Sequence, residues 1–312
     1  TNLGLTPEVT SCLEDLDNCD ATNALLDYVN ANSTNIAFAQ LAAQAICDGF
    51  EVDFINEIIY DIDQKCAKEV VKKVLNNSST LSQTILGYFN QNKDYTIKYK
   101  NTDIPNGAQG AVLPLADCEN NSCNIDVLLN NSMLNNSTDM FIAKVALHET
   151  LHATLVYLFE TGQFVDQGLD PDANTDPDYN TLVLSYVLYL VTTNPENYIG
   201  SANVLQHNYI NTFIDGMIVT LQTVGVSLGY SADSPVMQSD YLESLVWSGS
   251  LEETPEFDDF DFNEQQLINA IGIAELFNNP HPYQTYDVSG NILNNVASPQ
   301  ANQINNTNDP CY

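Results

Sequence analysis

Apolar side chains recur at helical spacing through most of the first third of the chain. Thr6-Pro7-Glu8 is typical of a helix start, because a capping threonine is followed by proline and an acid in the first turn. The same apolar spacing predicts four further helices, at residues 21–29, 36–47, 54–75 and 81–89. We therefore expect residues 1–64 to form a helical region that packs on a main domain.

The pattern changes to alternation after residue 94. Y-T-I-K-Y-K at 95–100 alternates apolar and polar positions and predicts a strand. Asn106-Gly107 and Gly110 mark turns. Further strands are expected at 111–115 and 124–129. A long helix should then run from about 138 to 159, with Ser137, Thr138 or Asp139 as its cap.

Helical periodicity dominates the rest of the chain. It predicts four more helices, at 181–191, 202–228, 240–247 and 264–277. The pattern as a whole predicts an α+β, mainly helical fold in which a small sheet precedes the long helix. We expect the main domain at 65–264, and a C-terminal helix with an Asn-rich tail at 265–312.

Composition narrows the class of protein. Of the 312 residues 44% are hydrophobic and 16% charged, which is typical of a globular chain. The 41 acidic residues face eight lysines and no arginine, a net charge of −33, and no lysine follows Lys144. Nucleic acid and anionic membrane surfaces are therefore excluded as partners, because phosphate binding needs a basic patch. The chain has no apolar run of eighteen residues, so we expect no membrane span.

The seven cysteines are scattered and form no C-x-x-C motif. Cys118 and Cys123 flank a short polar turn and predict a local disulfide. Cys12 and Cys19 could pair in the same way across a helix end. An odd number leaves one cysteine unpaired in the chain. Disulfides favour an oxidising compartment, so we expect a secreted, extracellular or cell-surface protein.

A metal-binding motif lies within the helix expected at 138–159. His148-Glu149-Thr150-Leu151-His152 matches H-E-x-x-H. Residues four apart share one face of a helix, so both imidazoles can bind one tetrahedral zinc ion. Glu149 would then be the catalytic base that takes a proton from the metal-bound water.

The third ligand decides the subclass of zinc site. The metzincin pattern requires glycine at 155 and histidine at 158; both positions hold leucine, which excludes that class. His207 is the favoured ligand, because it lies on the inward face of the helix expected at 202–228 and a buried histidine needs a partner. Glu243 is the main alternative, as a downstream acid on a second helix. Glu160 and Glu196 are further alternatives.

Several segments around these residues carry a family resemblance. They are Lys65-Cys66 at a helix start, I-D-V-L-L (125–129), I-A-K-V-A-L-H-E-T-L-H-A (142–153), Q-H-N-Y-I (206–210) and Y-L-E-S-L-V-W-S-G-S-L-E-E-T-P (241–255). Together they resemble an uncharacterised zincin-like domain found in secreted proteins and lipoproteins of Bacteroidetes. The resemblance implies zinc binding, with His207 as a ligand. Ser248 and Ser250 interrupt a Gly-Gly-Leu run expected in the last segment, so the resemblance gives that segment no clear role.

Analogy with zincins suggests how a substrate would bind. The strand at 125–129 would be the sheet edge that pairs with an extended peptide. Tyr209 or Tyr241 would donate a hydrogen bond to the oxyanion of the tetrahedral intermediate.

An acidic loop is a second candidate cation site. The run from Asp170 to Asp178 places an oxygen side chain at every second position, which suits Ca²⁺. Thr175 and Thr181 stand where an EF-hand loop needs glycine and a bidentate glutamate. These departures favour a solvated loop without calcium, and calcium binding is the alternative.

The sequence therefore predicts a secreted zinc metallopeptidase-like protein that acts on peptides or proteins. One alternative is an extracellular structural or adhesive assembly subunit, able to self-associate, that retains a zincin scaffold with a structural or absent metal. A third reading is a small-molecule or glycan hydrolase that uses the same metal-bound water.

Overall fold

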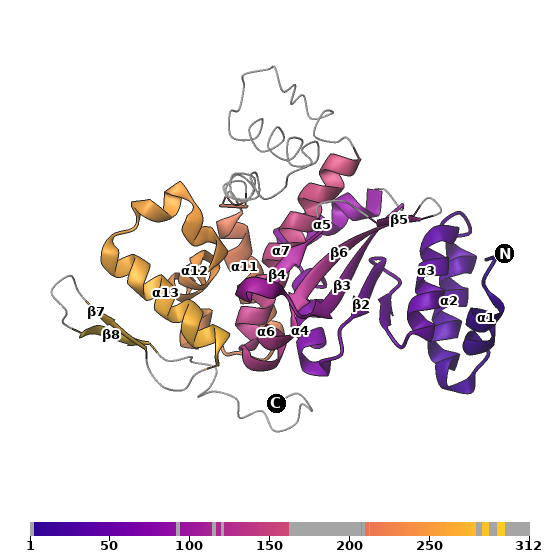
Figure 1. The fold of residues 1–312 in the computed structure, drawn as a ribbon, viewed down its shortest axis with the longest axis horizontal. Helices are drawn as coiled ribbons and strands as arrows, with labels where there is room; N and C mark the ends of the chain where they lie inside the picture. The colour runs from indigo at the N-terminus through magenta and orange to yellow at the C-terminus, as the bar shows by residue number, and fades with distance from the viewer. Residues whose placement is uncertain are drawn as a thin grey trace, which may run out of the picture.

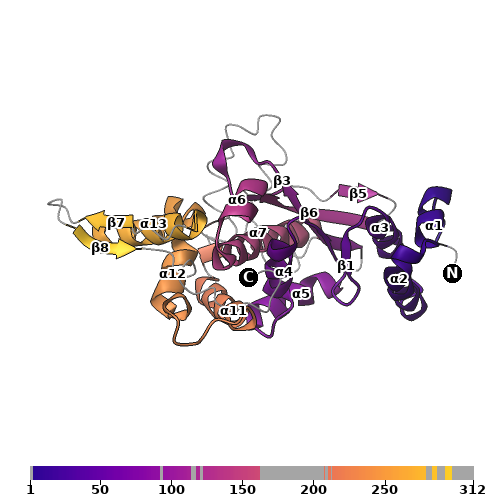
Figure 2. The ribbon, with the colours of Figure 1, turned by 90° about the horizontal axis from the view of Figure 1, so that it is seen from below.

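The protein is an α+β, mainly helical molecule, as the sequence predicts. The computed structural model describes residues 3–91, 94–113, 117–119, 122–161, 207, 210–211, 213–278, 283–286 and 292–296. Three groups of elements follow one another along the long axis (Figures 1 and 2). Helices α1 to α3 lie at one end, the main sheet and helix α7 in the middle, and α12, α13 and a small hairpin at the other end.

The main sheet has six strands in the order β1-β2-β3-β6-β4, with β5 paired to the start of β6. The bounds are β1 Glu51–Asp53, β2 Ile58–Asp61, β3 Tyr95–Thr102, β4 Gly110–Val112, β5 Asp117–Glu119 and β6 Ser122–Asn130. Strands β2, β3 and β6 are parallel, whereas β1, β4 and β5 pair antiparallel with their neighbours. The predicted strands at 95–100, 111–115 and 124–129 correspond to β3, β4 and β6. Gly110 begins β4, so the prediction of a turn at this residue is wrong.

The helix predicted at 54–75 is wrong over its first half. Strand β2 occupies Ile58–Asp61, and helix α4 begins only at Lys65 and ends at Leu75. Ile58, Ile59 and Tyr60 are all buried, because β2 lies inside the sheet between β1 and β3. A strand covered on both faces has a continuous apolar run, which spacing alone does not distinguish from a buried helix.

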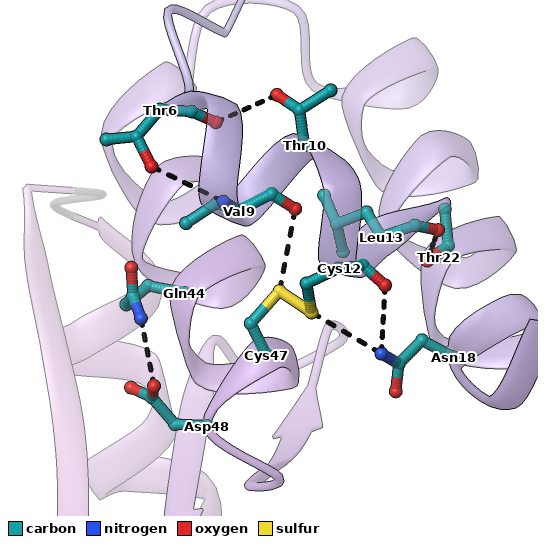
Figure 3. The surroundings of a disulfide bond; sticks show 10 residues. All are labelled: Thr6, Val9, Thr10, Cys12, Leu13, Asn18, Thr22, Gln44, Cys47 and Asp48. Atoms are coloured by element: carbon teal, nitrogen blue, oxygen red, sulfur yellow. Dashed lines mark hydrogen bonds between the residues drawn. A yellow bond between two sulfur atoms is a disulfide. The ribbon is translucent and has the colours of Figure 1, made fainter. Parts of the chain in front are cut away.

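The N-terminal helices form a group with its own apolar core. They are α1 Pro7–Leu13, α2 Cys19–Ala31 and α3 Ile36–Cys47. A disulfide between Cys12 and Cys47 joins the end of α1 to the end of α3 (Figure 3). The Cys12–Cys19 pairing is therefore wrong. The Cα atoms of Cys12 and Cys47 are 5.8 Å apart, within the usual disulfide range, whereas Cys19 is a free, exposed thiol at the start of α2.

Two other cysteines are also disulfide-bonded. These are Cys66 and Cys123. The antiparallel register of β5 and β6 places Cys118 directly opposite Cys123. This register agrees with the local pairing predicted across the turn.

Helix α7 spans Asp139–Glu160 and forms the centre of the molecule. Thr138 caps it, because its Oγ1 accepts a hydrogen bond from the amide of Phe141 at 3.2 Å. It packs on strands β4 and β6 of the sheet and on helices α4, α5, α11, α12 and α13. Most of its side chains are buried as a result, as expected for a helix enclosed on all sides.

Three of the remaining elements follow the predictions at 81–89, 240–247 and 264–277 closely. These are α5 Thr80–Gln91, α12 Ser239–Trp247 and α13 Phe262–Leu276. Helix α6 Asn131–Asn136 and the hairpin of β7 Tyr283–Tyr286 with β8 Ile292–Val296 were not predicted, and α11 spans Ile214–Ser227. The single helix predicted at 202–228 is interrupted, because Phe213 precedes α11 with a turn conformation, φ −103° and ψ 4°. Among the residues described, no helix is long and apolar enough to cross a membrane.

Candidate metal centre

The orientation of α7 determines where the motif side chains point. The Thr150 hydroxyl donates to the carbonyl of Ala146 at 2.6 Å, so the Tyr99 hydroxyl, also 2.6 Å away, is the donor to Thr150. This contact turns the Thr150 face of the helix towards β3. At 100° per residue, His148 and His152 lie on the opposite face of the helix.

Three imidazoles meet on that face. The Nε2 atoms of His148 and His152 are 3.2 Å apart. The ring of His207, which comes from the helical segment before α11, lies 5.2 Å from the ring of His148 and 5.3 Å from that of His152. One nitrogen from each ring lies within 4.8 Å of the other two. The structure thus brings together the three residues that the sequence proposed as metal ligands.

These distances fit a tetrahedral zinc site. Two Zn–N bonds of about 2.0–2.1 Å at the tetrahedral angle place their nitrogens about 3.3–3.4 Å apart. The 3.2 Å separation of the His148 and His152 Nε2 atoms is close to this value. His207 Nδ1 is buried and has no hydrogen-bond partner among the described residues, a situation that a metal or its surrounding ligands would relieve.

The protonation of the histidines also suits a metal. Burial lowers the pKa of His148 well below its usual value, and the neighbouring imidazoles and Lys144 lower it further. Burial lowers the pKa of His207 to about 3, again with help from His152 and Lys144. Both imidazoles are therefore neutral at pH 7, the form that binds a metal ion.

Glu149 is buried between α7 and the edge strand β4. Its side chain lies against Gly110, the first residue of that strand. Burial raises its pKa to about 8, and the positive charge of Lys144 opposes this rise. A carboxyl group with a pKa near neutrality can both take and release a proton, which is what a general base beside a metal-bound water must do.

Lys144 is a buried cation that the sequence reasoning did not include in the site. It lies one helical turn before His148, and its Nζ donates to the carbonyl oxygen of Ser248 at 2.6 Å. Burial lowers its pKa to about 8, while Glu149 and Glu252 raise it. The available signal was its position, because a lysine four residues before His148 in an otherwise apolar helix lies on the face that carries the histidines.

Two of the predicted alternatives lie elsewhere. Glu243 is not among the residues that converge with the histidine pair in the described part of the chain. Tyr241 is wrong as an oxyanion donor, because its hydroxyl donates to Glu275, which also accepts from Thr138 at the start of α7. Ten residues of helix separate Thr138 from His148, about 15 Å.

The predicted substrate edge is also corrected. Strand β6 is not an edge, since β3 pairs with one side of it and β4 and β5 with the other. The strand at the end of the sheet nearest the histidines is β4, beside Glu149. Sequence spacing does not reveal strand order: β6 is the last strand before α7 in the chain, but β4, which comes earlier, lies at the edge of the sheet.

Other predictions fall outside the described residues. They concern Tyr209, Glu196 and the calcium loop from Asp170 to Asp178, together with the helix at 181–191. These stay predictions.

Comparison with known proteins adds no assignment. No protein-family model, no curated protein and no solved structure matches the chain. The resemblance to a zincin-like domain therefore stays a prediction, and the functional argument depends on the residues themselves.

Proposed function

We propose that this chain is a zinc-dependent metallopeptidase-like enzyme of a secreted or cell-surface type. The observation that carries the proposal is the convergence of His207 on the H-E-x-x-H pair, although 55 residues separate it from His152. Three buried or half-buried imidazoles converge on one point, and two of them are neutral at pH 7. They would supply the three protein ligands typical of a catalytic zinc site.

The chemistry follows from the position of each group. When bound by the three histidines, a zinc ion would act as a Lewis acid and lower the pKa of its bound water to about 7. Glu149 takes the proton from the attacking water and passes it to the leaving amine. His148, His152 and His207 would hold the metal.

A peptide substrate is supported by the sheet edge. Strand β4 is short, lies at the end of the sheet, and has Glu149 beside its first residue. An extended peptide that pairs with β4 as an added strand would place its backbone carbonyls beside the general base. Strand addition recognises backbone amides, so this arrangement favours peptides over glycans or small molecules.

A second candidate is an extracellular assembly subunit with a structural metal. The net charge of −33 and the absence of arginine favour this reading as much as they favour an enzyme. In that case Glu149 would have no catalytic task, and its replacement would change stability only.

Glu149→Gln separates the two candidates. We expect the variant to bind one zinc per chain, as the wild type does, because glutamine keeps the shape of the side chain. Cleavage of a mixed peptide library, followed by mass spectrometry, should fall by at least about 100-fold, the lower range for loss of a general base. If the wild type binds zinc but cleaves no peptide, or if the variant cleaves as fast as the wild type, the peptidase proposal fails.

A further inference from the structure

Gly110 has no backbone reason to be glycine. It is the first residue of the edge strand β4 and pairs with Leu129 of β6. Its φ is not in the left-handed region, unlike that of Gly107 three residues earlier, which has φ +77°. Any residue can adopt its backbone conformation, so the requirement for glycine must come from the space around it.

Glu149 fills that space. A Cβ atom added to Gly110 would lie 2.5 Å from Cγ, 2.8 Å from Cδ and 2.7 Å from Oε1 of Glu149. Carbon atoms in contact are about 3.5–4.0 Å apart, so all three atoms overlap with the added methyl group. Rotation of the carboxylate alone does not remove the overlap, because Cγ is the nearest atom. The whole side chain would have to adopt a different rotamer.

The helix that carries Glu149 has little freedom to move away. Thr150, the next residue, is hydrogen-bonded to Tyr99 of β3. Six residues earlier on the same helix, Lys144 is hydrogen-bonded to the carbonyl of Ser248. A side chain at position 110 would therefore displace the carboxylate of Glu149 rather than the whole of α7.

We propose that Gly110 is a positioning residue for the general base. Because Gly110 has no side chain, the Glu149 side chain can pack directly against the backbone of the edge strand. This inference rests on the proposed function, because a positioned base affects catalysis only if the protein is a peptidase. The steric contact between Gly110 and Glu149 does not depend on that function.

Gly110→Ala tests the inference in the zinc-loaded full chain. We expect zinc content to stay at one per chain, because Glu149 is not a ligand, and kcat on a peptide cleaved by the wild type to fall about 100-fold, as a displacement near 1 Å can cause. KM should change little. Gly87→Ala is the matched control: Gly87 lies in α5 and lacks a positive φ. An added Cβ there would meet no described heavy atom within 4 Å apart from the neighbouring backbone of its own helix. The control should keep the wild-type kcat.

A double-mutant cycle on the metal-free protein tests the contact without using activity. Gly110→Ala should lower Tm by a few degrees in the wild-type background, because it overpacks the site. In a Glu149→Ala background, where Cγ and the carboxylate are absent, the same change should leave Tm nearly unaltered.

The outcomes are distinguishable. An equal Tm loss in both backgrounds, or an unchanged kcat in Gly110→Ala, overturns the positioning role. If the wild type proves inactive, the proposed function fails, while a background-dependent Tm loss would still establish the steric contact between Gly110 and Glu149.

Discussion

Lys144 is an ammonium group held inside the protein, where a charge needs compensation. It is 3% exposed, and its only hydrogen-bond acceptor within the described part of the chain is the Ser248 carbonyl. Burial without a directly bound carboxylate lowers its pKa to about 8, and Glu149 and Glu252 limit the decrease. The positive charge in turn opposes the rise in the pKa of Glu149. Lys144 therefore favours the ionised form of the proposed base.

Lys144→Met tests this burial through the pH dependence of stability. Between pH 8 and the ordinary lysine value of 10.5, the unfolded chain binds one proton more at this residue than the folded protein. The free energy of unfolding of the wild type should therefore rise with pH relative to the methionine variant, by up to about 1.4 kcal/mol per pH unit. Denaturant titrations of both metal-free proteins at pH 8 and pH 9.5 measure the difference. A difference that does not change with pH contradicts a lowered pKa for Lys144.

A buried hydrogen bond between Tyr99 of β3 and Thr150 links helix α7 to the sheet. The rings of Tyr99 and Tyr60 stack with centroids 5.7 Å apart, and both residues are fully buried. The Tyr99 hydroxyl is hydrogen-bonded to Thr150, whereas the Tyr60 hydroxyl has no hydrogen-bond partner among the described residues. Of these two similar rings, Tyr99 is hydrogen-bonded to α7 in the described part of the chain and Tyr60 is not.

Tyr99→Phe should destabilise the protein by about 1 kcal/mol, the usual net value of one buried hydrogen bond. Tyr60→Phe, the matched control, should be neutral or stabilising, because it removes a buried hydroxyl without a partner. Urea denaturation of the two variants makes the comparison. Equal effects of the two substitutions would show that the Tyr99–Thr150 hydrogen bond does not contribute to the free energy of unfolding.

Local patterns predicted some elements well and others poorly. The long helix and the strands at 95–100 and 124–129 were predictable, because their periodicity and caps are local properties. Strand β2 was not, since a fully buried strand resembles a buried helix in its apolar run. The edge position of β4 also depends on strand order, which the sequence does not contain. The substrate edge was therefore assigned to the wrong strand.

At the scale of the whole molecule, the candidate site joins distant parts of the chain. The spacing of His148, Glu149 and His152 was readable from the sequence because a helix fixes it. His207 could be inferred because an inward-facing histidine needs a partner. Lys144 and Gly110 were missed as site residues, because their roles arise from contacts with Ser248 and Glu149 that only the folded arrangement creates.

The overall charge is consistent with this arrangement. No lysine or arginine follows Lys144 in the sequence, so the C-terminal half has no fixed cation to neutralise its acids. The net negative charge of the protein would therefore attract a divalent cation. Zinc should stabilise the fold, because the three imidazoles come together only in the folded chain and zinc therefore binds the folded state more tightly than the unfolded one.

Zinc affinity of His207→Ala tests the central claim most directly, with His281→Ala, the remaining histidine of the sequence, as its control. The two variants and the wild type are titrated with zinc against a competing chelator. We predict one tightly bound zinc in the wild type and in His281→Ala. In His207→Ala the zinc affinity should fall by more than about 100-fold, which is more than the loss of a group that only hydrogen-bonds to a ligand would cause. Wild-type affinity in His207→Ala, or no tight site in the wild type, would contradict the three-histidine centre.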